Sequence, residues 1–536
     1  MKQTTETKVR IVTAASLFDG HDAAINIMRR IMQAKGAEII HLGHNRSAHE
    51  IVETAIEEDA QAIAITSYQG GHVEFFKYIK DLLEENGCGH IKIFGGGGGT
   101  ILPEEIKELH DYGITRIYSP DDGRQLGLEG MIEDVIKQSA SPQALTAEPK
   151  WNGQLPLNEA KDVRRIARAI SRAEAGNGYS DVIEKIEIKT ANNAPVLGIT
   201  GTGGAGKSSV TDEIVRRFLH NFTDKTIAVI SVDPSKKKTG GALLGDRIRM
   251  NAVNHPRAYM RSLATRDDNT ALSQHVQEAI EICKMAGFDF IILESAGVGQ
   301  SDTAILDYCD ISMYVMTPEY GAASQLEKIN MLDYADIICI NKFDKAGALD
   351  AMADVKKQYK RNHQLFTAKD GDLPVIGTMA SKFNDDGVNH LFELLLKKLQ
   401  EKRQVSFGDF QFSETAKVSQ AVIPPGRVRY LSEISENNRS YDRNTEEQAG
   451  IASKLCQVQG VLEMIRSGKS RGDESLEKAL QQQAEVLNAQ LTPESKKMLE
   501  QWEARKKEYS KDEYEYKVRD KVLRQPLITT TLSGTR

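Results

Sequence analysis

A glycine-rich turn reads Gly201-Thr202-Gly203-Gly204-Ala205-Gly206-Lys207-Ser208, after the apolar run Val196–Ile199 and before a helical pattern over 210–219. The order of strand, turn and helix, with the pattern G-x-x-x-x-G-K-[ST], is typical of a loop that cradles nucleotide phosphates. Glycines let backbone N–H groups converge on phosphate oxygens, and the helix N-terminus adds partial positive charge. We expect Lys207 to reach the β- and γ-phosphates, Ser208 to bind Mg²⁺, and the backbone as far as Ser209 to line the cradle.

Composition sets the broad class. The chain has 536 residues, enough for about three domains. Its net charge is −7 and it has no long basic run, so we expect no nucleic-acid partner. No apolar run approaches the roughly 20 residues of a membrane span, so we expect no membrane partner either. The five cysteines are scattered and form no C-x-x-C pair, and the polar stretch Met1–Arg10 is unlike a signal peptide, which together favour a cytoplasmic location.

The first 140 residues alternate short apolar runs with helical patterns, which predicts an α/β, flavodoxin-like, doubly wound parallel sheet. On such sheets ligands bind beyond the C-terminal ends of the strands. The predicted strands are Val9–Thr13, Ala37–Ile40, Ala62–Thr66, Ile91–Phe94 and Thr115–Tyr118.

Three stretches follow the first, third and fourth of these strands. They read Asp19-Gly20-His21-Asp22-Ala23-Ala24, Thr66-Ser67-Tyr68 and Gly95-Gly96-Gly97-Gly98-Gly99-Thr100. A loop histidine can bind a metal through one ring nitrogen while a carboxylate two residues earlier holds the other N–H. A surface histidine is the commoner alternative for any one such residue.

Together the three stretches resemble the cobalamin-binding domain of B12-dependent mutases and methionine synthase, with its D-x-H-x-x-G motif, a later serine and a glycine pair. Ala24 stands where the family has glycine. The resemblance implies that His21 coordinates the cobalt of the cofactor and that Asp19 supports His21. It also implies that Ser67 faces the displaced nucleotide tail, which Gly95 and Gly96 admit between strand and helix.

Residues 141–190 are predicted to link this domain to the next. The linker is rich in turn residues, and within it 158–175 has the pattern of a basic amphipathic helix. Such a helix can bind a partner, but we expect a solvated helix between domains.

The nucleotide domain is predicted over 191–405. Asn341-Lys342-Phe343-Asp344 follows the strand-like run Ile337–Ile340 and indicates which base is bound. A carboxylate at Asp344 can accept hydrogen bonds from guanine N1–H and the 2-amino group, whereas adenine offers neither donor and would leave a buried carboxylate unpaired. Charge-assisted bonds contribute about 1.5–3 kcal/mol each, so we expect GTP rather than ATP.

A carboxylate for Mg²⁺ is expected where a second strand of this domain ends, at Glu294-Ser295-Ala296-Gly297. Many GTPases have D-x-x-G there, and the longer glutamate can still serve the ion, directly or through water. We assign Lys207 and Glu294 as catalytic residues. These features resemble the G-protein metallochaperones that guard B12 mutases, which implies that Asp233 and Asp246 approach Mg²⁺ and that Arg249 approaches the nucleotide. Val232 and Ser295 complete the candidate metal set, and a surface loop is the alternative for Asp246.

The C-terminal region, 406–536, is predicted to be a helical arm. Helices are expected over 445–466 and 474–491, followed by a charged helix to about Asp520. Leu476, Leu480, Leu487 and Leu491 recur at helical spacing, which indicates packing rather than chemistry.

The order of a cobalamin-type domain, a mutase-type G domain and a helical arm resembles the fused isobutyryl-CoA mutases over nearly the whole chain. This implies adenosylcobalamin, GTP and Mg²⁺, with GTP gating the loading and protection of a cofactor that interconverts isobutyryl-CoA and butyryl-CoA. The chain ends at Arg536, where that family would begin an acyl-CoA-binding barrel of roughly 250 residues. We therefore expect a mutase barrel as partner, in a longer chain or as a separate subunit, and a homodimer. A stand-alone GTP-dependent cobalamin carrier and a non-enzymatic B12 sensor are the alternatives.

Slow GTP hydrolysis is the first testable prediction. Position 298 is Val, where many GTPases keep a glutamine that orients the attacking water, and Gln300 is not at the matching position. We expect slow release of phosphate by the purified chain alone. Fast turnover in that assay would contradict the assignment.

Overall fold

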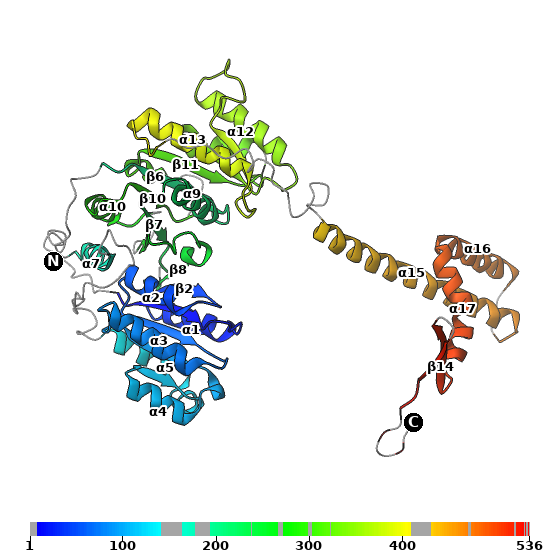
Figure 1. Cartoon of the computed structure of the whole chain (residues 1–536). Coiled ribbons are helices and arrows are strands. Elements are labelled where there is room, and N and C mark those ends of the chain that lie inside the picture. The colour runs from blue at the N-terminus through cyan, green and yellow to red at the C-terminus, as the bar shows by residue number, and fades with distance from the viewer. Residues whose placement is uncertain are drawn as a thin grey trace. The chain divides into compact units, whose positions relative to one another are not determined.

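The computed structural model describes residues 8–140, 163–176, 193–236, 238–265, 272–297, 303–321, 323–408, 430–469, 473–518, 521–529, 531 and 534. The chain divides into two compact units, Met1–Ser419 and Gln420–Arg536 (Figure 1). Most of the predicted linker, together with Val298 and Gln300, lies outside the described residues.

The first sheet has six parallel strands in the order β5-β4-β3-β1-β2-β8. Helices α1 to α5 connect or follow its first five strands, which confirms the doubly wound fold. The strands are β1 Arg10–Ala15, β2 Glu38–Gly43, β3 Ala62–Thr66, β4 Lys92–Gly96, β5 Arg116–Tyr118 and β8 Ala242–Leu244. The helices are α1 Ala23–Ala34, α2 Ala48–Glu57, α3 His72–Glu85, α4 Pro103–Tyr112 and α5 Pro120–Ser139, with the 3₁₀ turn η1 Gly98–Thr100.

The second sheet has seven parallel strands in the order β13-β12-β11-β6-β10-β7-β9. The strands are β6 Val196–Gly201, β7 Ile227–Asp233, β9 Ala258–Ala264, β10 Phe290–Glu294, β11 Ile311–Met316, β12 Ile337–Asn341 and β13 Val375–Thr378. The helices are α9 Lys207–Asn221, α10 Val276–Met285, α11 Met331–Tyr334, α12 Ala348–Asn362 and α13 Asp386–Arg403. Short 3₁₀ turns are η2 Asp246–Arg249, η3 Ala304–Asp307 and η4 Ala323–Lys328.

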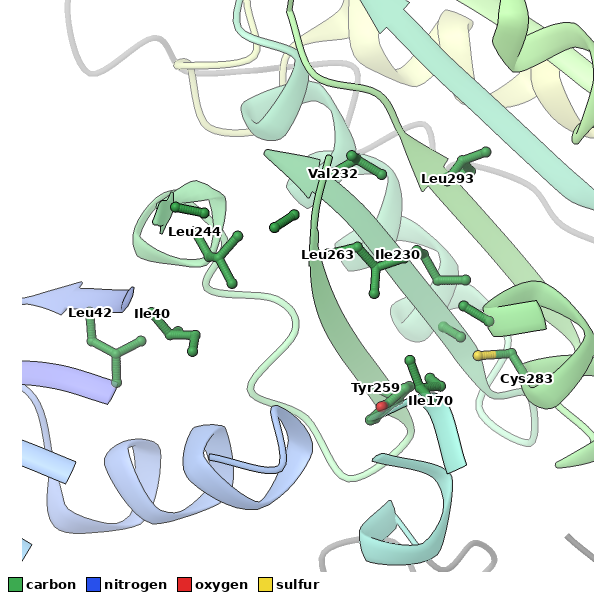
Figure 2. Close-up of a cluster of buried hydrophobic side chains, with 14 of the residues drawn as sticks. Ile40, Leu42, Ile170, Ile230, Val232, Leu244, Tyr259, Leu263, Cys283 and Leu293 are labelled. Atoms are coloured by element: carbon green, nitrogen blue, oxygen red, sulfur yellow. The ribbon is translucent and has the colours of Figure 1, made fainter. Parts of the chain in front are cut away.

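Strand β8 is not among the strands that the sequence predicts. Ala242–Leu244 lies between β7 and β9 in the chain, yet it pairs with Glu38–Ile40 at the edge of the first sheet. Three residues are too few to show a strand period in the sequence. Burial of Ala242 and Leu244 stabilises the pairing, and one apolar cluster runs from Ile40 and Leu42 through Leu244 to residues of the second sheet (Figure 2).

Helix α7, Val163–Glu174, is also different from the solvated helix that we expected. Its apolar face is buried, with Ile166, Ala167 and Ile170 fully inaccessible, and it packs against α2 and α10. Its arginines have partners in the first domain: Arg164 donates to the carbonyl of Asn86, 2.6 Å away, and Arg168 lies 3.1 Å from Asp59. The basic face that suggested solvent is therefore largely paired.

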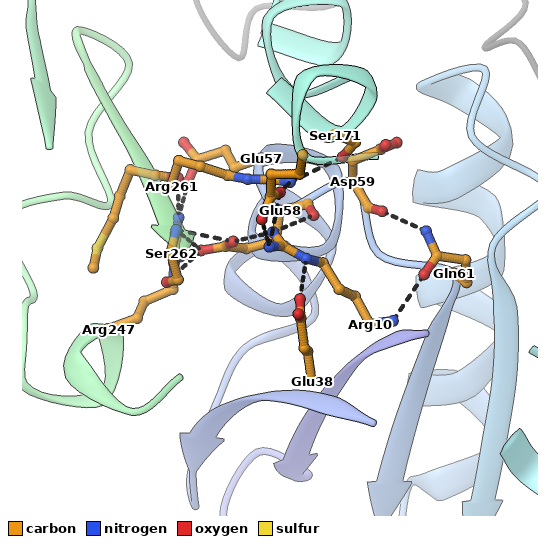
Figure 3. Close-up of polar contacts among 12 residues, drawn as sticks. Arg10, Glu38, Glu57, Glu58, Asp59, Gln61, Ser171, Arg247, Arg261 and Ser262 are labelled. Atoms are coloured by element: carbon orange, nitrogen blue, oxygen red, sulfur yellow. Dashed lines mark hydrogen bonds and ion pairs between the residues drawn. The ribbon is translucent and has the colours of Figure 1, made fainter. Parts of the chain in front are cut away.

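A buried network of charges lies where α7, the first sheet and the second sheet meet (Figure 3). Arg10 lies 2.9 Å from both Glu38 and Glu174, and Arg261 lies 2.7 Å from Glu174. Arg247 lies 2.6 Å from Glu57, whose pKa burial raises to about 7 while Arg247 opposes the rise. Each charge has a partner of opposite sign, as buried charges require.

The second unit contains α15 Tyr430–Arg466, α16 Glu474–Gln490, α17 Pro493–Tyr509 and an antiparallel hairpin of β14 Glu513–Val518 with β15 Lys521–Pro526. The charged helix predicted to reach about Asp520 ends at Tyr509 instead. The sequence Glu513-Tyr514-Glu515-Tyr516-Lys517-Val518 alternates with the period of a strand, which explains the change. Leu487 and Leu491 are buried in a small core with Leu455 and Leu462, whereas Leu476 is exposed. No helix in the described part of the chain is long and apolar enough to cross a membrane.

Removing the shared anion of the charge network is expected to weaken the first unit. Glu174→Gln leaves Arg10 and Arg261 with less compensating charge in a buried place, and breaking a buried pair typically costs about 3–5 kcal/mol. The measurement is the free energy of unfolding in urea. Glu108→Gln, which breaks the exposed pair with Lys77, is the control and should change little. Equal losses in the two variants would contradict the buried network.

Candidate functional sites

The glycine-rich turn has the shape that a phosphate cradle needs. Gly201 and Gly206 have φ of 151° and 90°, and a side chain would collide with the Val315 carbonyl at Gly201 and with Asn341 at Gly206. Helix α9 begins at Lys207, so the N–H groups of its first turn face the turn that precedes it. The Nζ of Lys207 lies 3.4 Å from the Gly201 carbonyl. The cradle is therefore formed by backbone that only glycine can supply at two positions.

Carboxylates gather at the start of α9. The Ser208 hydroxyl lies 2.9 Å from Asp246 Oδ1 and 2.9 Å from Glu294 Oε1. The other oxygens of these carboxylates accept hydrogen bonds from Ser231, at 2.6 Å, and Thr211, at 3.0 Å. This places three predicted residues together and gives Asp246 a place inside the site rather than on a surface loop.

The electrostatics at the start of α9 favour the binding of a cation. Burial, with the nearby charge of Asp246, raises the pKa of Glu294 to about 8 and that of Asp233 to about 8. Within the described ranges no three His, Cys, Asp or Glu side chains form a metal cage by themselves. Mg²⁺ commonly binds one or two carboxylates and completes its shell with phosphates and water. The Ser208, Asp246 and Glu294 oxygens fit that requirement.

The remaining predicted metal residues lie beside this group. Asp233 accepts a hydrogen bond from the N–H of Gly245, 2.9 Å away. Val232 has an apolar side chain in the core, so only its backbone carbonyl could serve a metal, and the Ser295 hydroxyl donates to Thr200 at 2.8 Å. Arg249 is exposed at the end of η2.

The predicted base-binding loop is tied to the phosphate cradle. Asn341 Nδ2 donates to the Ala205 carbonyl at 2.9 Å, and Lys342 Nζ donates to the Gly204 carbonyl at 2.7 Å. Phe343 packs against Gly377, where a side chain would collide with its ring. Asp344 is exposed rather than buried. Its preference for guanine would therefore come from the bonds it accepts and less from the cost of leaving a buried charge unpaired.

In the first sheet, the loop after β1 holds a histidine in one orientation. Asp19 is fully buried and accepts from His21 N–H at 2.9 Å, His21 Nδ1 at 2.8 Å and Tyr68 N–H at 2.6 Å. Burial opposes ionisation, but these donors hold the pKa of Asp19 below its usual value. Since Nδ1 donates its proton to Asp19, Nε2 carries the lone pair, and the side chain is 65% exposed. A histidine whose second nitrogen is held by a carboxylate has the arrangement that a metal ligand needs.

A cavity of about 200 Å³ lies beside this loop, between the first sheet and helices α1 and α5. Its lining is largely apolar and includes Met28, Phe94, Tyr118, Met131 and the backbone of Gly95–Gly98. This suits the flat, largely apolar base of a cobalamin tail. Ala24, where the family has glycine, is not among the residues that line the cavity. Sequence reasoning missed Met28, Tyr118 and Met131 because apolar and aromatic residues on helices and strands look the same whether they line a cavity or fill a core.

Ser67 and the glycine run 95–99 also make packing contacts and hydrogen bonds next to this cavity. Ser67 is buried, accepts from the Ser16 hydroxyl at 2.8 Å and donates its N–H to Gly96 at 2.9 Å. A side chain at Gly95 would collide with the ring of Phe76, and one at Gly97 with the Ser67 carbonyl. The glycine run therefore allows α3 and the Ser67 loop to approach β4, in addition to lining the cavity.

Alanine substitutions in the glycine run test this reading. Gly95→Ala should lower the free energy of unfolding by about 1–3 kcal/mol, because the added methyl overpacks against Phe76. Gly99→Ala is the matched control, since no atom lies within 4 Å of its added methyl. Chemical denaturation of both variants gives the comparison. A Gly95→Ala protein as stable as Gly99→Ala would show that the close approach is not needed.

Both domains are similar to known proteins. Residues 9–118 match the B12 binding domain, and residues 166–420 match the methylmalonyl-CoA mutase-associated GTPase MeaB. A fused isobutyryl-CoA mutase from Geobacillus kaustophilus is 52% identical over 98% of this chain and 49% of its own length. The fused isobutyryl-CoA mutase from Cupriavidus metallidurans is 49% identical over 99% of this chain and 48% of its own length.

The match to the B12 binding domain includes His21, and the match to the MeaB-type GTPase includes the phosphate cradle. Cobalamin and GTP are therefore the ligands of this chain, with Mg²⁺ as the usual companion of GTP. The chain spans about half the length of the curated relatives it matches. Over that half, the chain is similar in sequence to the fused isobutyryl-CoA mutases, with a B12 binding domain followed by a MeaB-type GTPase domain.

Proposed function

We propose that this chain is the part of an acyl-CoA mutase that holds adenosylcobalamin and uses GTP to control how the cofactor is loaded and protected. The observation that carries the proposal is the pair Asp19 and His21, with a buried carboxylate fixing an exposed imidazole beside an apolar cavity. The rearrangement of isobutyryl-CoA to butyryl-CoA, proposed by analogy with the relatives, also needs an acyl-CoA-binding barrel, in a longer chain or as a separate subunit. Homodimerisation and a cytoplasmic location stay predictions.

On the first sheet, the residues of this chain would bind and orient the cofactor. Bound adenosylcobalamin would supply a cobalt–carbon bond that breaks to give the radical needed for a carbon-skeleton rearrangement. His21 Nε2 would ligate cobalt, and Asp19 would keep the proton on Nδ1 so that this nitrogen stays available. The cavity lined by Met28, Tyr118 and Met131 would take the displaced tail.

On the second sheet, the residues would bind GTP and stabilise the charge that moves during hydrolysis. Lys207 and the N–H groups of the cradle would hold the β- and γ-phosphates, while Ser208, Asp246 and Glu294 would hold Mg²⁺ with Asp233 nearby. Asp344 would accept hydrogen bonds from the guanine base. Arg249, exposed on η2, would approach the phosphates from outside.

Spectra of cobalamin-loaded protein test the proposal directly. With adenosylcobalamin, the wild type should give a spectrum in which the cofactor's own base is displaced and a histidine ligates cobalt. His21→Ala should lose that signature and bind at least about tenfold more weakly, because the ligand is removed. His44→Ala, at an exposed histidine close to the same edge of the sheet, is the control.

Retention of the histidine-ligated spectrum in His21→Ala would show that another residue is the ligand. Absence of cobalamin binding by the wild type would overturn the cofactor part of the proposal and leave a GTPase with an unknown client.

A further inference from the structure

The segment between β7 and β9 connects two strands of the second sheet and contributes a strand to the first. Its strand β8 pairs with β2, and the Ala242 N–H donates to the Ala37 carbonyl at 3.2 Å. The preceding Gly241 packs so closely on α1 that a side chain would collide with the Gln33 carbonyl. The next residues, Asp246–Arg249, form η2 at the nucleotide site. Residues 242–246 thus run from the cobalamin sheet directly to the predicted Mg²⁺ ligand.

Neighbouring side chains of η2 face opposite sides. Asp246 lies within hydrogen-bond distance of Ser208 and Ser231 in the nucleotide domain, at 2.9 and 2.6 Å. Arg247 is buried against the cobalamin domain, where Nη2 lies 2.6 Å from Glu57 and Nε lies 3.5 Å from Glu58. Since the two residues are adjacent on a short turn, a shift of Arg247 displaces Asp246.

The acidic pair that receives Arg247 is itself fixed (Figure 3). Glu57 and Glu58 end helix α2, and Glu58 accepts from the Ser262 N–H at 3.1 Å and the Ser262 hydroxyl at 2.8 Å. Arg247 also donates to the Met260 carbonyl at 2.7 Å. The guanidinium is therefore held at once by α2 of the first domain and by β9 of the second. A planar group with several donors can do this, and an ammonium cannot do it equally well.

The far end of η2 is held by the first domain as well. Arg46 donates to the Ile248 carbonyl at 3.3 Å, and Ile248 packs on Gly43, where an added methyl would lie 2.9 Å from its Cδ1. Both ends of the turn thus rest on the first domain, one on helix α2 and the other on the end of β2 and the loop after it. The position of Asp246 depends on contacts outside the nucleotide domain.

We propose that Arg247, together with Glu57 and Glu58 of the cobalamin-binding domain, positions Asp246 for Mg²⁺·GTP. These three are positioning residues, since they act through Asp246 and touch neither the metal nor the nucleotide. The inference rests on the proposed function of the nucleotide site and adds that this site is complete only when the cobalamin-binding domain is docked against it. By linkage, if the cobalamin-binding domain positions the metal ligand of the nucleotide site, nucleotide binding in turn stabilises the docked cobalamin-binding domain.

Arg247→Lys tests the proposal in the full chain. The dissociation constant for a slowly hydrolysed GTP analogue is measured with Mg²⁺ and with EDTA. Lysine keeps the charge but cannot hold both glutamates and the Met260 carbonyl, so Mg²⁺-supported affinity should fall about tenfold, within the usual range for coupling between sites. Binding in EDTA, which needs only the cradle and the base loop, should stay unchanged. Glu57→Gln should show the same pattern in weaker form, and it carries the test if Arg247→Lys does not fold.

Arg261→Lys is the matched control. Arg261 is equally buried in the same network, but it contacts Ser171 and Glu174 rather than the acidic pair of α2. If loosening the domain contact in general were enough, this variant would lose Mg²⁺-supported affinity as well, and the specific role of Arg247 would be overturned. Adding Arg247→Lys to Asp246→Asn should cause no further loss, because the positioned group is already removed. Additive losses would contradict action through Asp246.

Failure of the inference and failure of the proposed function give different results. A wild type that binds the analogue more tightly with Mg²⁺, beside an Arg247→Lys protein that does the same, would overturn the positioning role alone. A wild type that binds no GTP analogue would overturn the nucleotide site and the inference with it. The cobalamin spectrum of each variant should stay that of the wild type, since His21 and its loop are untouched.

Discussion

The pairing of the three-residue strand Ala242–Leu244 with β2 is the constraint on which the arrangement of the first unit depends. It places a segment of the GTPase domain at the edge of the B12-binding sheet, and the apolar cluster around Leu244 then becomes continuous between the two sheets. The residues that follow the strand cannot be placed independently of it. For that reason one structural element joins the nucleotide site to the sheet that carries the cobalamin site, although their ligands never need to touch.

The two sites differ in how far their residues are arranged for the ligand before it binds. The His21 loop is already arranged, because Asp19 has three donors and the imidazole proton is fixed on Nδ1. The nucleotide site instead brings Glu294, Asp233 and Asp246 together at a cost, seen in the raised pKa values of the first two. A group of buried carboxylates is stabilised most by a bound divalent cation. The histidine loop, by contrast, needs little rearrangement to accept cobalt.

Local sequence patterns predicted much of the fold and of the two candidate sites. They did not predict the long-range packing. The phosphate cradle, the Asp19 and His21 pair and the alternating elements of the first domain were predictable because each depends on a few residues close in sequence. Strand β8 was missed because its partner lies about 200 residues away and its three residues show no period. The burial of α7 was missed because its arginines suggested solvent, although they pair with Asp59 and Asn86. The exposure of Asp344 depends on the surrounding loops, which the motif does not specify.

The most direct test of the account follows bound cobalamin during heating of the full chain, with and without a saturating Mg²⁺·GTP analogue. A ligand at 100 times its dissociation constant stabilises the unit that binds it by about 2.7 kcal/mol. If the two sheets form one cooperative unit through β8, the temperature at which the bound-cobalamin spectrum is lost should rise when the analogue is present. Loss of the cobalamin spectrum at the same temperature, while only the GTPase domain is stabilised, would contradict the account.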